Sequence, residues 1–216
     1  LLFAQVNAFV SPGVASGENI YIDPASGVNV SQDPKILIPK INVEAPVMYD
    51  VNTLDEPVIQ QKLKDGVVHY PIPGANAMPG QTGNTVVLGH SSNDVFDDGK
   101  YKFVFVQLDR LESGDKFYLH YNGTRYTYQV TEKKIIDPTE VNQLVINNGK
   151  PLATLVSCTP PGTALKRLIV IGEQISPDPS TASEQTADQT KPTAERATAI
   201  GGVAPSFFER LFNVSF

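Results

Sequence analysis

Short apolar stretches, separated by turn-forming residues, run through most of the chain. Strands are predicted where apolar residues alternate with polar ones or cluster over four to nine positions, at 35–43, 45–49, 85–90, 116–121, 125–136, 153–158 and 167–172. The first contains Pro39, so we expect it at a sheet edge or bulge. Asn122-Gly123 between two of the strands is a strong hairpin signal. Residues 66–84 are predicted to form a long loop.

Helical spacing is confined to short segments. Residues 54–64 carry apolar side chains close to helical spacing, with acidic residues early and lysines late, as the helix dipole favours. Short helices are also predicted within 101–111 and 137–145. Many short strands with only short helices between them favour a mainly β fold, a closed or nearly closed barrel, over a parallel doubly wound sheet.

Composition divides the chain into four parts. Residues 1–34 are rich in Gly, Ser, Asn and Pro, and we expect an irregular arm. Residues 35–175 carry the predicted strands. Residues 176–206 are rich in Ser, Thr, Pro, Ala and Gln, which predicts a linker, because such a segment buries too little apolar surface to offset its ordering entropy. Residues 207–216 are apolar and aromatic.

Charge and motifs exclude several classes of function. The net charge of −6 argues against nucleic-acid binding, which needs a basic surface. The segment 80–84 lacks the lysine of a phosphate-binding loop, and no GxSxG motif of a serine hydrolase occurs. One cysteine and three scattered histidines lack metal-ligand spacing. We therefore expect no metal and no cofactor, and leave a requirement for calcium open.

The single cysteine, Cys158, cannot form an internal disulfide, so it is either a buried inert residue or a reactive thiol. It ends one predicted strand, and Arg167 begins the next. If these strands pair side by side, the thiol and the guanidinium meet at the same end of a sheet. A fixed positive charge beside a thiol favours the nucleophilic thiolate.

A nucleophilic cysteine needs an acid/base partner, and acyl transfer needs a donor to the oxyanion. His90 ends an apolar strand and enters a loop, a position from which a side chain faces a site on a rigid scaffold. His69 stands at the start of a loop and could line a pocket, whereas His120 is expected to be structural within a hairpin strand. Cys158, His90 and Arg167 could converge on one rim of the barrel.

These residues lie in segments that resemble the sortases, a family of surface transpeptidases of Gram-positive bacteria. The cysteine strand is similar to the family's TLxTC strand, with Ser157 where threonine is usual, and the arginine follows nine residues later. The similar segments are TLVSC at 154–158, RLIV at 167–170, NTVVLGH at 84–90, HYP at 69–71, PGQTG at 79–83 and residues 35–47. The resemblance covers roughly residues 35–175.

The resemblance implies a closed eight-stranded barrel and a two-step transpeptidation. Cys158 would attack the backbone carbonyl of a C-terminal sorting motif of LPxTG type and form a thioester acyl-enzyme. His90 would protonate the leaving amine and then take the proton of an incoming amine, and Arg167 would hydrogen-bond the substrate carbonyl and its oxyanion. His69, Ser157 and Thr159 are expected to contact the substrate.

The implied partners are surface proteins or pilins that carry a sorting signal. The amine acceptor would be a cell-wall peptide or a pilin lysine, so the enzyme would anchor surface proteins or assemble pili. We expect it at the extracytoplasmic face of the membrane, anchored through apolar segments beyond the two ends. The arm at 1–34 could act as a lid through Asp23-Pro24, although Ala25 stands where such lids carry an aromatic residue.

Two alternatives share these residues. One is a barrel that keeps the scaffold but not the chemistry, and that binds peptides or scaffolds a partner. The other is a cysteine protease, a simple hydrolase that releases its product to water.

Overall fold

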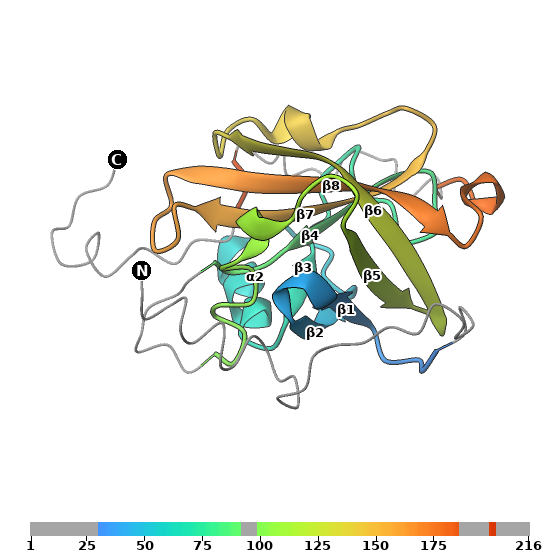
Figure 1. The fold of residues 1–216 in the computed structure, drawn as a ribbon. Helices are drawn as coiled ribbons and strands as arrows, with labels where there is room; N and C mark the ends of the chain where they lie inside the picture. Colours follow the sequence, from blue (N-terminus) through green and yellow to red (C-terminus); the bar gives the residue numbers. More distant parts are fainter. Residues whose placement is uncertain (1–29, 92–98, 186–198, 202–216) are drawn as a thin grey trace, which may run out of the picture.

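The short apolar stretches form eight strands in the part of the chain that the structure, a computed structural model, describes: residues 30–91, 99–185 and 199–201. The strands are β1 (Lys35–Ile38), β2 (Val43–Met48), β3 (Val67–His69), β4 (Gly83–Leu88), β5 (Lys116–Tyr121), β6 (Thr124–Ile136), β7 (Pro151–Thr159) and β8 (Lys166–Ser176). They close in the order β1-β2-β3-β4-β7-β8-β6-β5, and β5 pairs back to β1 (Figure 1). The prediction of an eight-stranded barrel is confirmed.

Two features of the first half of the barrel differ from the sequence-based expectation. The predicted strand 35–43 ends early, at Ile38 of β1, and the predicted strand 45–49 corresponds to β2, which begins at Val43. The two are antiparallel and are joined by the 3-10 turn η1 (Pro39–Ile41) and by Asn42 at a left-handed φ of 51°. Pro39 cannot donate to a ladder, so the chain turns there. The predicted loop 66–84 begins with β3, which lies parallel to β2 and antiparallel to β4. Three residues are too few to show a strand's alternation.

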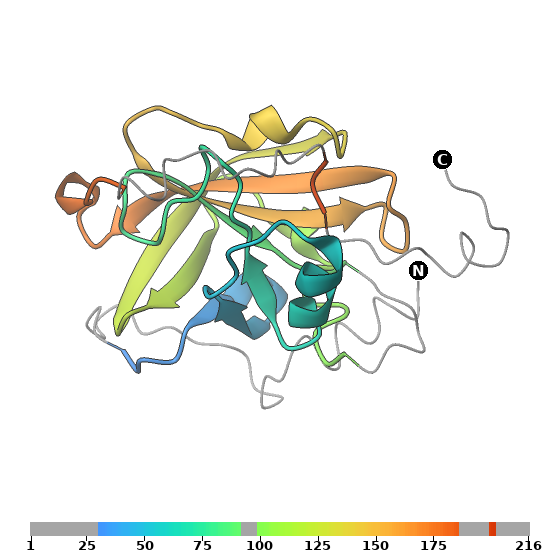
Figure 2. The same cartoon turned by 180° about the vertical axis from the view of Figure 1, so that it is seen from behind.

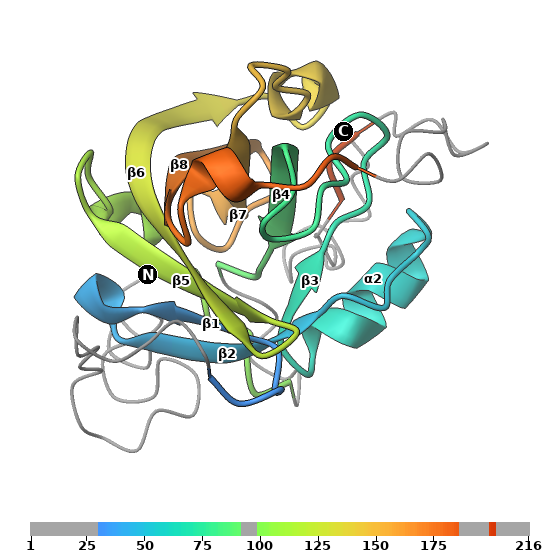
Figure 3. The same cartoon turned by 90° about the vertical axis from the view of Figure 1, so that its right-hand side faces the viewer.

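The helical segments are shorter than predicted. The expected helix at 54–64 is α2 (Glu56–Leu63), with Ile59 and Leu63 buried. Figures 2 and 3 show α2 outside the barrel, beside β3. The other predicted helices are 3-10 turns, η2 (Leu108–Arg110) and η3 (Val141–Leu144), and a further turn, η4 (Pro179–Thr181), follows β8.

Strand alternation divides the buried side chains into two apolar clusters. The inner cluster draws on all eight strands and includes Val87 and Leu155, so it fills the barrel. The outer cluster draws on β3, β4, β6, β7, β8 and α2 and includes Leu88 and Val156. Neighbouring residues of β4 and β7 thus point to opposite faces of the sheet. This division decides which side chains can meet at a site.

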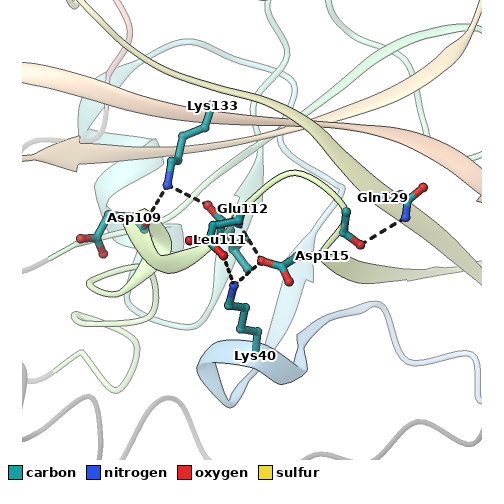
Figure 4. Close-up of polar contacts among 8 residues, drawn as sticks. Lys40, Asp109, Leu111, Glu112, Asp115, Gln129 and Lys133 are labelled. Atoms are coloured by element: carbon teal, nitrogen blue, oxygen red, sulfur yellow. Dashed lines mark hydrogen bonds and ion pairs between the residues drawn. The ribbon is translucent and has the colours of Figure 1, made fainter.

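The turn after η2 is fixed to the barrel by lysines (Figure 4). Lys40 Nζ lies 3.1 Å from a Glu112 carboxylate oxygen and 2.7 Å from one of Asp115, and these bonds raise the pKa of Lys40. Lys133 Nζ of β6 donates to the carbonyl oxygens of Asp109 at 2.6 Å and Leu111 at 2.8 Å. The cluster is largely exposed, so it positions the turn more than it stabilises the fold.

The described parts of the predicted linker contact the barrel. Thr82 N–H donates to the Ser183 carbonyl at 2.8 Å, and Ser183 N–H donates to the Gly80 carbonyl at 3.0 Å. Ile200 is buried. The rest of the linker, nearly all of the arm at 1–34 and the segment 207–216 lie outside the described residues. No helix among the described residues is long and apolar enough to cross a membrane.

Acid is expected to destabilise the fold through His69. Burial lowers the pKa of this fully buried ring from 6.5 to about 4, so between these values the unfolded chain binds the proton more readily. The contribution of His69 to the free energy of unfolding is fully present above the pKa of the unfolded chain, 6.5, and is lost as the pH falls toward 4. At pH 5 the loss from this one group is about 2 kcal/mol relative to pH 8.

Denaturant unfolding at pH 5 and pH 8 measures this loss, with His69→Gln as the comparison. His120, whose pKa burial also lowers to about 4, contributes to both proteins alike. The difference between the two pH values is expected to be smaller in His69→Gln. An equal difference in both proteins would contradict the assignment.

Candidate functional site

Cys158 lies near the end of β7, directly opposite Arg167 of β8 in the antiparallel ladder. Cys158 is two residues from Val156 in β7, and Arg167 is two residues from Ile169 in β8, so each shares a face of its strand with a residue of the outer cluster. The thiol and the guanidinium therefore lie on the same face of adjacent strands. Both residues are buried, with 8% and 3% of their surface exposed.

His90 comes to the same end of the sheet from the other side of β7. The parallel β4–β7 ladder pairs Leu88 with Val156, and Gly89 N–H continues it with a 3.0 Å bond to the Val156 carbonyl. His90 follows Gly89 and leaves β4 at the same end of the sheet at which Cys158 lies in β7, because the two strands are parallel. The buried His90 carbonyl accepts a 2.8 Å bond from Phe105 N–H, which ties the end of β4 to the loop after it.

Gly89 allows the end of β4 to pass close to the Phe105 ring. A Cβ at position 89 would come within 2.5 Å of the Phe105 ring. The close passage of strand and ring thus depends on the absence of a side chain just before His90. The structure brings the three predicted residues to one end of the barrel, with Cys158 in β7, Arg167 in β8 and His90 just beyond the end of β4.

The Arg167 guanidinium is held by backbone carbonyls. Nη1 donates to Ala164 at 3.0 Å and to Lys166 at 3.2 Å, which fixes the planar group over the start of β8. Nε and Nη2 both donate to the Ile200 carbonyl, at 3.2 Å and 2.8 Å. The outward-facing side of the fork is therefore shaped to bind a single peptide carbonyl oxygen.

The charge of Arg167 does not determine the state of the Cys158 thiol. Burial raises the pKa of Cys158 above its ordinary value, Arg167 lowers it, and Glu56 raises it. The burial effect is the largest, so the thiol is protonated at neutral pH in this arrangement. The neighbouring arginine lowers the pKa of the thiol, in the expected direction, but burial opposes it with the larger effect, because a buried anion costs more free energy than the cation returns.

The expected substrate contacts are not all brought to the site. His69 shares its face of β3 with Val67 of the inner cluster, and its Nε2 lies 3.2 Å from the Ala77 carbonyl oxygen. Ser157 shares its face of β7 with Leu155, also inside the barrel. Both therefore lie on the other face of the sheet from Cys158. Thr159, partly buried at the end of β7, stays a candidate for contact with the substrate.

Sequence reasoning missed the polar contacts of Tyr70, near the site, and of Asn84, toward the opposite end of the β4–β7 ladder. Tyr70 Oη accepts a 3.1 Å bond from Gly201 N–H. Asn84 Nδ2 donates to the Leu144 carbonyl at 2.8 Å, and its Oδ1 accepts from Thr154 Oγ1 at 2.9 Å, so it ties η3 to β4 and β7. Ile200 carried one signal, because Ile200 and Val203 are the large aliphatic residues of the sequence between positions 177 and 204.

Within the described ranges, no group of three or more His, Cys, Asp or Glu residues could hold a metal ion. The chemistry that the arrangement offers is therefore that of a thiol, an imidazole and a guanidinium. These can act as nucleophile, acid/base and oxyanion donor.

Comparison with known proteins identifies a family. A family model described as "Sortase domain" matches residues 36–175. Among curated proteins, Sortase D of Bacillus subtilis is 28% identical over 142 residues, 64% of this chain and 62% of that protein. Sortase A of Listeria monocytogenes is 37% identical over 92 residues, 42% of this chain and 38% of that protein. The chain thus covers less than two thirds of the length of these relatives.

Solved structures agree with the sequence comparisons. A sortase C from Clostridium perfringens has a TM-score of 0.52 at 28% identity, covering 81% of this chain and 85% of that one. A structure of Clostridium perfringens sortase C with the C-terminal cell wall sorting motif has a TM-score of 0.54 at 27% identity, with the same coverage.

The ionisation of Cys158 is open to direct test. The rate of alkylation by iodoacetamide is expected to keep rising with pH beyond the ordinary thiol pKa of about 8.5. Arg167→Gln removes the influence that lowers this pKa, so its profile should move to still higher pH. Lys166→Gln, an exposed neighbour on β8, removes the same charge and should leave the profile nearly unchanged. A shift of the Arg167→Gln profile to lower pH would contradict the electrostatic assignment.

Proposed function

Because this chain belongs to the sortase family, we propose that it is a cysteine transpeptidase that cleaves a sorting motif of LPxTG type and joins it to an amine. Cys158 is the nucleophile, His90 the acid/base and Arg167 the oxyanion donor. Thr159 contacts the substrate beside the thiol.

One observation carries this proposal: Arg167 donates two hydrogen bonds to a single peptide carbonyl, opposite the cysteine in the ladder. A peptide carbonyl held there is polarised by the guanidinium. When sulfur attacks, negative charge develops on that oxygen, and the two bonds strengthen because both come from a cation. The site thus favours the tetrahedral state over the planar amide.

The raised pKa of Cys158 sets the order of proton transfers. His90 takes the thiol proton as Sγ bonds to the carbonyl carbon. When the carbon–nitrogen bond breaks, His90 gives that proton to the leaving amine, and a thioester remains. An incoming amine then attacks the thioester and loses a proton to His90, which returns it to the sulfur as the new amide forms.

The substrates in this proposal are surface proteins or pilins that carry a sorting signal. A solved relative, the sortase C of Clostridium perfringens, was obtained with its C-terminal cell wall sorting motif. The acceptor is the amine of a cell-wall peptide or of a pilin lysine, so the enzyme works at the extracytoplasmic face of the membrane, to which it is anchored.

The test incubates the protein with a panel of LPxTG-like peptides and an amine, and follows acyl-enzyme and joined product by mass. Cys158→Ala should form neither. His90→Ala and Arg167→Ala should each lower the rate of transfer by about a hundred-fold or more. His120→Gln, on β5 away from the site, is the matched histidine control and should transfer at the rate of the unchanged protein.

The products separate the alternatives. A joined product that depends on Cys158 supports transpeptidation. Hydrolysed peptide without any joined product would identify a peptidase instead. Peptide binding without an acyl-enzyme, or activity retained in Cys158→Ala, would overturn the mechanism.

A further inference from the structure

A short segment far beyond the barrel in sequence is bound at the site. Ile200 follows the end of β8 by more than twenty residues, yet only 1% of its surface is exposed. Its N–H donates to the Pro138 carbonyl at 2.7 Å, and its carbonyl accepts both bonds from Arg167. Gly201 N–H donates to Tyr70 Oη at 3.1 Å. Consecutive backbone groups are thus held by three separate parts of the barrel.

The side chains of this segment fit their surroundings as closely as its backbone does. The Ile200 side chain belongs to the outer apolar cluster, together with Leu88, Val156 and Ile169 of the three strands that carry the site. At the next position, a Cβ would collide with the Glu56 carboxylate and lie 3.1 Å from Tyr70 Oη. The site therefore holds an aliphatic side chain followed by glycine, and a side chain at position 201 would require the Glu56 carboxylate to move.

Figure 2 shows this segment, drawn in dark red, between α2 and the strands β7 and β8. The contact satisfies a requirement of the site itself. A buried guanidinium needs an acceptor, since leaving its donors unsatisfied costs free energy. The Ile200 carbonyl supplies that acceptor without any substrate present.

We propose that Ile200-Gly201 is a substrate-mimicking intramolecular ligand, which occupies the place of the substrate's scissile carbonyl and must leave before a sorting peptide can bind. This inference rests on the proposed function. An LPxTG motif also ends in a β-branched residue followed by glycine, so the mimic presents the same order of side chains to the site. The substrate that fits best has a β-branched residue and then glycine at these positions.

Occupancy by the protein's own chain has a quantitative consequence. A ligand tethered to its site competes at a high effective concentration, so it raises the apparent KM for a free peptide without a new contact to that peptide. It leaves kcat unchanged, because the segment is absent from the complex that reacts.

The test uses the full chain with Ile200→Asp, which places a carboxylate in the apolar cluster and should expel the segment. Ala199→Asp adds the same charge at the exposed neighbouring residue and is the matched control. In Ile200→Asp, Cys158 should be alkylated by iodoacetamide about ten-fold faster, and KM for an LPxTG-like peptide should fall about ten-fold at unchanged kcat. Ala199→Asp should change neither. Thermal unfolding confirms that both variants are folded.

Gly201→Ala provides a second route if Ile200→Asp does not fold, because its Cβ meets Glu56 and Tyr70 without a buried charge. A synthetic peptide with the sequence of residues 196–204 should restore protection of Cys158 in the variants. The same peptide with glycine in place of isoleucine should not. The added peptide would thus replace the segment that the substitution has expelled from the site.

The outcomes distinguish this inference from the function on which it rests. Faster alkylation and protection by the peptide, with no transfer product from any substrate, would support occupancy while the proposed transpeptidation fails. Folded Ile200→Asp with unchanged alkylation and unchanged KM would overturn the inference. Faster alkylation that the peptide cannot reverse would also overturn it, because the segment would then be a structural clamp.

Discussion

The ladder that places β7 between β4 and β8 is the constraint on which the site depends. It puts Cys158 opposite Arg167 on one side, and its parallel half carries His90 to the same end on the other. Because side chains alternate, a slip of one residue in either register would turn Cys158 into the barrel and bring Ser157 outward. The buried alternation of β7 against two apolar clusters makes such a slip costly, so packing holds the chemistry in register.

Burial and the charge of Arg167 have opposite effects on the pKa of the Cys158 thiol. Burial raises the pKa of Cys158 more than Arg167 lowers it, so the sulfur is kept protonated until a partner takes its proton. The same burial obliges Arg167 to find an acceptor, and it binds a peptide carbonyl. The Ile200 carbonyl meets that requirement, since it accepts hydrogen bonds from both Nε and Nη2 of Arg167.

Much of the barrel could be predicted, since short strands and turns leave local signals such as Asn122-Gly123, whose left-handed φ angles of 49° and 72° form the β5–β6 turn. β3 was not predicted, because a strand of three residues is too short to show an alternation of apolar and polar residues. His69 and Ser157 were expected at the substrate for their type and position along the chain. Each lies next to a residue that faces the site, but strand alternation turns both into the barrel.

The amino-acid sequence alone was enough to predict seven of the eight strands, the order of His90, Cys158 and Arg167, and the kind of chemistry that these side chains can perform, because spacing and residue type are local properties of the chain. The fold was needed to show the face on which each side chain lies, the burial that raises the pKa of the Cys158 thiol, and the return of Ile200 to Arg167. These depend on burial and on contacts between residues far apart in sequence, which no local pattern encodes.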